Sequence, residues 1–237
     1  MTKKTKQTRT ARTTQTETER LAEKGRLITE RMKQVYPDSE CALEYGGDPW
    51  RLLVMARLSA QCTDARVNIV CRELFEEFPD CASMAKGDIS EIERIVKPCG
   101  LFRGKAKSIK EASEMIEAKH GGRIPDTMEE LLALPGVGRK IANLILGDVY
   151  KKGGIVADTH CMRICGRLGF YPEGKKDPLM TEKIMDSYVE RSEQSDFCHR
   201  IVNFGRDRCT AQSPKCGGCP ASDLCDSFAR RSAADEK

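Results

Sequence analysis

The sequence has few aromatic residues and no long apolar run. Aromatic residues make up 5% of the 237 positions, with a single Trp. No stretch approaches the roughly 20 apolar residues of a membrane-spanning helix, so we expect no membrane contact. Met1 and Ala11 are the only apolar residues before Leu21, which is not the pattern of a secretory signal. We therefore expect a cytoplasmic protein.

Strand patterns are also missing. Apolar and polar residues nowhere alternate over a long stretch, and no repeat has the period of a solenoid. Apolar residues instead recur at helical spacing, which predicts an all-α fold. The expected helices include residues 21–35, 50–60, 64–78, 89–96, 109–116, 131–134, 139–149, 159–168, 180–188 and 197–202.

The net charge of +4 comes from one end of the chain. Residues 1–20 hold six Lys or Arg and two Glu, a difference of +4, so the remainder is formally neutral. Charge alone therefore does not mark the remainder as DNA-binding. Residues 1–17 have almost nothing to bury, and we predict a disordered arm there. It is either a basic arm that adds nonspecific affinity for nucleic acid or a solvated tail without a role.

Twelve cysteines are present, and four of them are clustered. In a reducing cytoplasm, clustered cysteines bind metal more often than they form disulfides. Cys209, Cys216, Cys219 and Cys225 have the spacing C-x6-C-x2-C-x5-C. Zinc sites usually combine two short pairs, and only one is present here, so the spacing leans toward a [4Fe–4S] cluster. Structural zinc and plain reduced thiols remain alternatives.

The segment 127–149 predicts two helices joined by a tight hairpin. Thr127 and Glu130 have the spacing of a capping box, Pro135-Gly136 ends the first helix, and the second begins at Arg139. We expect Gly138 to allow close approach of another backbone. Unpaired N–H groups at the start of the second helix suit a phosphate.

Arg139 and Lys140 stand at a helix start, where the helix dipole disfavours positive charge. Such a local conflict is often functional. The dipole and partial burial would together favour the neutral, nucleophilic form of the Lys140 amine. The alternative is an ordinary surface lysine on a helix–helix turn.

Asp158-Thr159-His160 begins a later helix. Asp158 is an expected N-cap, and its carboxylate is also a candidate to face the hairpin. His160 alone is more often a structural histidine than a ligand.

Four motifs in order resemble the endonuclease III family of helix–hairpin–helix DNA glycosylases. They are the segment 58–64, the hairpin 134–140, Asp158-Thr159-His160 and the four cysteines, and the resemblance runs from about residue 21 to 225. It implies two helical lobes. Residues 42–152 would form a six-helix bundle with the hairpin, and residues 18–41 plus 153–226 an iron–sulfur lobe, followed by a flexible tail over 227–237.

The same resemblance implies roles for single residues. Lys140 matches the family's nucleophile and Asp158 its catalytic carboxylate. Gln61 matches a residue that fills the gap left by a flipped nucleotide, and Leu101 matches a wedge, although a polar helix end and an apolar loop residue are simpler explanations. The expected DNA contacts are these two and Gly136, Val137, Gly138, Arg139 and His160. The cysteines Cys209, Cys216, Cys219 and Cys225 would hold a [4Fe–4S] cluster.

The implied activity is that of a bifunctional glycosylase and abasic-site lyase in base-excision repair. Its substrate would be double-stranded DNA with an oxidised pyrimidine or an abasic site, cut by β-elimination through a lysine Schiff base. We expect a monomer associated with the nucleoid. The alternatives are a noncatalytic DNA-binding module with zinc and a monofunctional mismatch glycosylase, which would lack a lysine at position 140.

Overall fold

The computed structural model describes the backbone of residues 4–235 and the side chains of residues 16–234. Over this part of the chain every regular element is helical, which confirms the predicted all-α class. The chain divides into two compact units, Cys41–Gly154 and Met1–Glu40 with Ile155–Lys237, which are described separately. None of the described helices has the length and hydropathy needed to cross a membrane.

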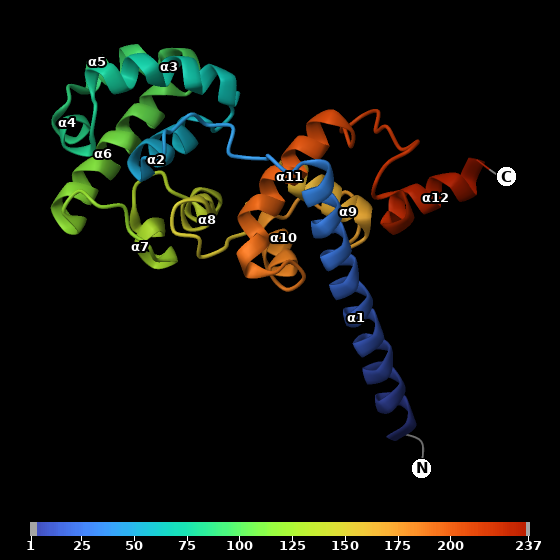
Figure 1. Cartoon of the computed structure of the whole chain (residues 1–237). Coiled ribbons are helices and arrows are strands. Elements are labelled where there is room, and N and C mark those ends of the chain that lie inside the picture. Colours follow the sequence, from blue (N-terminus) through green and yellow to red (C-terminus); the bar gives the residue numbers. More distant parts are fainter. Residues whose placement is uncertain (1–3, 236–237) are drawn as a thin grey trace. The chain divides into compact units, whose positions relative to one another are not determined.

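The unit Cys41–Gly154 contains seven α-helices, all within the described residues. They are α2 (Pro49–Leu58), α3 (Asp64–Glu77), α4 (Cys81–Lys86), α5 (Ile89–Val96), α6 (Phe102–His120), α7 (Met128–Ala133) and α8 (Arg139–Asp148), with the short η1 (Lys97–Cys99) before α6 (Figure 1). The helix beyond the expected six is α4, a six-residue helix that the apolar spacing did not indicate. A capping box between Asp80 and Ser83 starts it.

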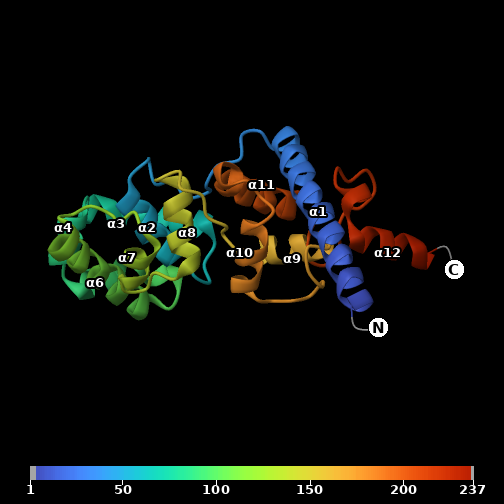
Figure 2. The same cartoon turned by 90° about the horizontal axis from the view of Figure 1, so that it is seen from below.

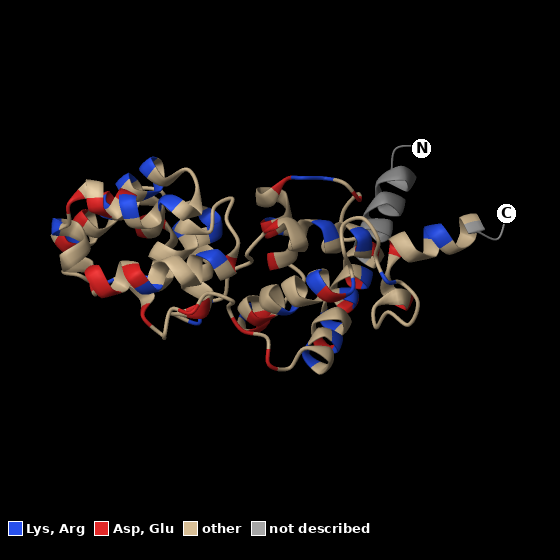
Figure 3. Cartoon of the chain, turned by 90° about the horizontal axis from the view of Figure 1, so that it is seen from above, with Lys and Arg blue, Asp and Glu red and all other residues tan. Residues whose placement is uncertain are grey.

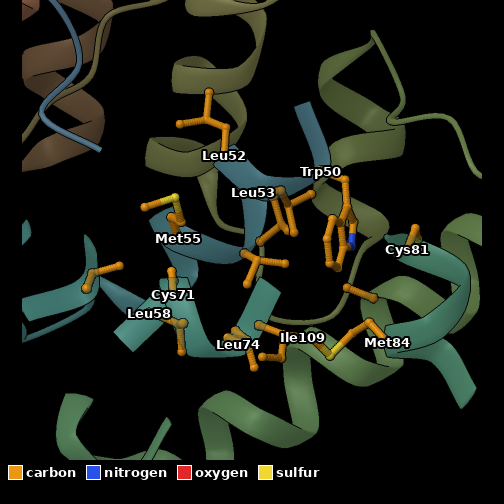
Figure 4. Packing of buried hydrophobic residues seen from close by; sticks show 14 of the residues in the cluster. Trp50, Leu52, Leu53, Met55, Leu58, Cys71, Leu74, Cys81, Met84 and Ile109 are labelled. Atoms are coloured by element: carbon orange, nitrogen blue, oxygen red, sulfur yellow. The ribbon is translucent and has the colours of Figure 1, made fainter. Parts of the chain in front are cut away.

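Helix α2 lies at the centre of this unit, and most of its residues are buried. Leu52, Leu53 and Met55 are at most 1% exposed, and they pack among side chains from the surrounding helices (Figure 4). Trp50 is also buried, and its indole Nε1 donates to Oγ of Ser113 on α6 at 3.0 Å. The core therefore joins α2 to α6. The loop that follows α2 and the loop that precedes α6 are both attached to this core.

The other unit contains α1 (Lys4–Val35), α9 (Thr159–Leu168), α10 (Pro178–Asp186), α11 (Gln194–Asp207), α12 (Asp226–Asp235) and the short η2 (Arg191–Glu193) and η3 (Ser222–Leu224) (Figure 2). The buried ammonium of Lys24 on α1 donates to the carbonyl of Leu168 at 2.5 Å and to Asp226 at 2.7 Å. This one group ties α1 to the end of α9 and to the start of α12.

Both ends of the chain differ from the sequence expectation. Helix α12 runs through Asp235, where a flexible tail was predicted, and its contacts to Lys24 and the burial of Ser227 explain the order. Helix α1 begins at Lys4, within the arm predicted to be disordered over residues 1–17. The side chains of residues 1–15 lie outside the described residues, so the role of the arm stays a prediction.

Charges of both signs are interspersed along the helices of each unit (Figure 3). Exposed ion pairs such as Arg94–Glu73 and Arg26–Glu23 are part of this pattern. Pairs of this kind contribute little to the stability of the fold. Because the two signs are interspersed (Figure 3), the surface charge does not mark a binding face either. A DNA-binding face therefore has to be found from local geometry.

Removing side-chain volume beside the buried indole should destabilise the bundle. Leu53→Ala deletes a 1% exposed side chain, and we expect it to lower the free energy of unfolding by about 2–5 kcal/mol. Ile69→Ala, at a 60% exposed position, is the matched control and should change it by at most about 0.5 kcal/mol. Thermal unfolding followed by circular dichroism gives the comparison, and equal effects of the two changes would contradict this description of the core.

Candidate active site and metal centre

The predicted helix–hairpin–helix is present as α7, a tight turn and α8. Thr127 caps α7 by accepting the N–H of Glu130 at 3.3 Å. In a full capping box the Glu130 carboxylate would accept the backbone N–H of Thr127. Here it accepts the hydroxyl of Thr127 instead, at 2.6 Å. The N–H of Val137 then donates to the carbonyl of Leu134 at 3.1 Å and closes the turn.

Close approach occurs at Gly136 and not at Gly138, where the sequence analysis expected it. Gly136 has φ +76°, the left-handed value needed after Pro135 in a type II turn. A Cβ there would lie 2.6 Å from Nε of Arg57 and 2.8 Å from Cβ of Ser108. The glycine is therefore required both by its backbone angle and by the contact of the turn with α2 and α6.

Gly138 borders open space instead. It is the N-cap of α8, makes no side-chain cap, and has nothing within 4 Å of where a Cβ would be. Arg139 and Lys140 follow it, and both side chains are exposed. The partial burial expected for Lys140 is thus absent, and the feature that remains is a lysine in the first turn of a helix whose start is accessible.

Val137 differs from its hairpin neighbours because its side chain is 7% exposed and packs into the core. Its N–H is used within the turn. Val137 was predicted to contact DNA, but neither its side chain nor its backbone N–H is available for such a contact. Its side chain instead packs the hairpin against the bundle.

Gln61 and Leu101 are exposed residues with left-handed backbone angles. Their φ values are +56° and +47°, and Leu101 is 65% exposed. A leucine is disfavoured in this region by its Cβ, and its apolar side chain gains nothing from water. Strain of this kind at an exposed apolar tip suits a residue that is placed for contact with a ligand.

Asp158 is the N-cap of α9, as predicted. Its Oδ1 accepts the N–H of Cys161 at 2.7 Å, and the residue is half-buried. A carboxylate at a helix start is favoured by the helix dipole, so the cap also holds a negative charge in a defined place.

His160 is two residues further along the chain. Its Nδ1 lies 3.2 Å from Nη2 of Arg163, and a Cβ on Gly205 would collide with the ring. These neighbours within one unit favour the structural role for His160, and the DNA contact expected from the family stays a prediction.

Cys209, Cys216, Cys219 and Cys225 all line one pocket between α9, α11 and the loop that precedes α12. The apolar walls include Leu168, Phe204 and Phe228. All four thiols are free and half-buried. The structure thus places four thiols, which are spread over 17 residues of sequence, around one pocket, and thiolates are soft metal ligands.

Two arginines on α9 donate hydrogen bonds to the loop that carries the cysteines, residues 209–225. The sequence analysis did not identify them. Arg167 is buried and donates to Sγ of Cys209 at 3.3 Å and to the carbonyls of Thr210 and Ala211. Arg163 donates to the carbonyl of Cys209 at 2.9 Å. The sequence places these two arginines four residues apart and so on one face of α9, but it gives no sign that this face meets the cysteine loop.

The predicted site residues fall into two groups. Gln61, Leu101 and the hairpin with Lys140 belong to the unit Cys41–Gly154, while Asp158, His160 and the four cysteines belong to the other.

Comparison with known proteins adds to this geometry. Residues 54–191 match the HhH-GPD superfamily of base excision DNA repair proteins. Endonuclease III of Synechocystis sp. is 41% identical over 83% of this chain and 89% of its own length, and endonuclease III of Bacillus subtilis is 38% identical over the same shares.

A solved structure of an endonuclease III–DNA covalent intermediate is also similar. It matches with a TM-score of 0.82 and 36% identity, and the match covers 89% of this chain and 98% of that one. Similarity of this extent, over most of the chain, shows that the chain belongs to the endonuclease III family, the DNA glycosylases and abasic-site lyases of base-excision repair.

Proposed function

We propose that this protein removes oxidised pyrimidines from double-stranded DNA and cuts the strand at the resulting abasic site, with Lys140 as the nucleophile and Asp158 as the catalytic carboxylate. The observation that carries the proposal is Lys140 itself, the exposed lysine in the first turn of α8, directly after a hairpin with an open helix start. A monofunctional glycosylase would not need this amine. We further propose a monomer that meets its substrate at the nucleoid.

The hairpin holds the DNA backbone while Lys140 reacts. The first-turn N–H groups of α8 and the open space at Gly138 suit a phosphate oxygen. The neutral amine Nζ bonds to C1′ of the sugar while the C1′–N bond breaks, and the bonding pair leaves with the base. Opening of the sugar ring gives a protonated Schiff base, which acidifies the C2′ hydrogens. Loss of one C2′ proton expels the 3′ phosphate, and water releases Lys140.

Asp158 stabilises the positive charge that develops on the sugar as the base leaves. Its bond to the N–H of Cys161 orients the carboxylate before reaction, so no reorganisation is needed at that moment. The same carboxylate is able to accept a proton from the attacking amine.

Gln61 and Leu101 open the duplex in this proposal. Leu101, as an exposed apolar wedge, enters the base stack, and Gln61 fills the gap left by the flipped nucleotide. A damaged base costs less to unstack than a normal pair, which contributes to substrate selection. The endonuclease III structure with 36% identity holds DNA as a covalent intermediate, which supports both the partner and the chemistry proposed here.

We assign the pocket lined by Cys209, Cys216, Cys219 and Cys225 to a [4Fe–4S] cluster. Four thiolates in one pocket fit such a group, and the buried Arg167 beside Cys209 offsets the negative charge that thiolate ligation brings. When bound, the cluster supplies a cross-link between the loop and α12 rather than reaction chemistry. The loop then holds the basic side chains of Arg208 and Lys215 in place beside the DNA.

Lys140→Gln should abolish strand cleavage and the trapping of an enzyme–DNA adduct by borohydride. We expect the lyase rate to fall by about ten-thousandfold or more, because a covalent nucleophile is lost. Binding to the duplex should remain, since the hairpin backbone is unchanged. Lys119→Gln, an exposed lysine at the end of α6, is the matched control. An adduct of Lys140→Gln at the yield of the unsubstituted protein would assign the nucleophile to another amine.

Asp158→Asn should remove the negative charge of this side chain and keep its role as the N-cap of α9. Asn caps a helix about as well as Asp, so thermal stability should change little. Base release should slow by about a hundredfold to a thousandfold, because a neutral amide does not offset the charge on the sugar. Single-turnover release of an oxidised pyrimidine measures the effect, and a rate within a factor of about two of the unsubstituted protein would remove Asp158 from the mechanism.

Cys216→Ser should eliminate the metal centre. The unsubstituted protein, purified anaerobically, should be yellow-brown and contain about four irons per chain. The variant should lose this iron and show a loosened unit around α9 and α12, while the unit Cys41–Gly154 keeps its helices. Cys41→Ser, in that other unit, is the control and should retain the iron. Stoichiometric zinc without iron in the unsubstituted protein would contradict the cluster.

A further inference from the structure

Lys105 is a lysine with almost no access to water. Its side chain lies at the start of α6 and is 1% exposed, and its amine Nζ donates to the carbonyl of Leu58 at 2.7 Å and to the carbonyl of Cys99 at 2.8 Å. Burial lowers the pKa of Lys105 below its ordinary value. Burying an amine of this kind is costly unless hydrogen bonds replace those it made with water, and Lys105 makes two.

The two acceptors are the ends of two helices. Leu58 is the last residue of α2 and Cys99 the last residue of η1, and the last carbonyls of a helix lack partners within it. Their partial negative charge attracts a cation, so one ammonium caps both ends. Burial and the neighbouring Cys62 thiol raise the pKa of Cys99 to about 11, so this thiol adds no negative charge beside Lys105 at neutral pH.

Each capped end leads directly into one of the strained residues. Gln61 follows Leu58 by three residues, and Leu101 follows Cys99 by two. The backbone N–H of Lys105 also donates to the carbonyl of Leu101 at 3.2 Å. Lys105 is therefore bonded to the base of both loops, and directly to the residue proposed as the wedge.

The next turn of α6 supports the hairpin. The hydroxyl of Ser108 donates to the carbonyl of Lys105 at 3.0 Å and accepts a hydrogen bond from Nε of Arg57 at 2.8 Å. Gly136 packs against the side chains of Ser108 and Arg57. The first turns of α6 thus contact the three segments that carry Gln61, Leu101 and Lys140.

From these contacts we propose that Lys105 is a positioning residue, which holds the Gln61 and Leu101 loops at a fixed separation so that both side chains enter the duplex together. The inference rests on the proposed roles of these two residues in opening DNA. Lys105 itself touches neither DNA nor the reacting sugar, so its effect should be confined to substrates that have to be opened.

The test compares one lesion in two contexts. An abasic site in double-stranded DNA requires opening, whereas the same site in single-stranded DNA does not. Lys105→Met keeps the length of the side chain and removes both hydrogen bonds. We expect it to slow cleavage of the duplex by about tenfold to a hundredfold, as for a displaced positioning group, and to change cleavage of the single strand by less than about twofold. Lys119→Met should change neither rate.

Two further measurements separate positioning from simple loss of structure. Duplex opening is read from the fluorescence of 2-aminopurine placed opposite the abasic site, and Lys105→Met should lose most of the increase seen with the unsubstituted protein. In a double-mutant cycle, Leu101→Ala with Lys105→Met should be little slower on duplex DNA than Leu101→Ala alone, since both changes remove the same function.

The possible outcomes are distinct. Equal slowing on both substrates, or additive effects in the cycle, would overturn the positioning role. If Lys105→Met does not fold, Lys105→Gln replaces it, and failure of both to fold would assign Lys105 to stability alone. Absence of cleavage of either substrate by the unsubstituted protein would instead contradict the proposed lyase function, independently of Lys105.

Discussion

The contact of the hairpin turn with the bundle depends on the missing side chain of Gly136. Any Cβ at this position would overlap Arg57 and Ser108, and the left-handed backbone there would be strained besides. Because the turn lies flat on α2 and α6, Val137 is buried on one side and the start of α8 opens on the other. The orientation of Lys140 follows from this contact, since Lys140 is on the first turn of α8.

The two units use buried cations in the same way. Lys105 joins the ends of α2 and η1, and Lys24 joins the end of α9 to the start of α12. In both places an ammonium satisfies helix carbonyls that no backbone N–H reaches. Arg167 extends the pattern to the cysteine loop, where its guanidinium binds two carbonyls and a sulfur. The loops proposed to contact DNA or to hold the cluster are in this way bonded to helices, and their exposed tips stay uncovered.

The residues proposed to contact DNA share a feature that differs from their supports. Gln61, Leu101 and the hairpin glycines have unusual backbone angles or open surroundings, whereas Lys105, Ser108 and Val137 beneath them are buried. The strained backbone at Gln61 and Leu101 is tolerated because the surrounding core holds it in place. A site built in this way is organised before the substrate arrives, so little ordering is left for the binding step.

The sequence by itself determined the helical class, the helix starts at Thr127 and Asp158, the hairpin and the close spacing of four cysteines. These features are local, because caps, turns and short spacings depend on residues within a few positions of one another. Only the tertiary structure decided that Gly136 rather than Gly138 makes the close approach, that Val137 is buried, and that Lys105 and Arg167 donate to distant backbone carbonyls. Those contacts join residues 28 to 79 positions apart in the chain. A lysine or arginine in a helix gives no sign of whether it faces water or a distant carbonyl.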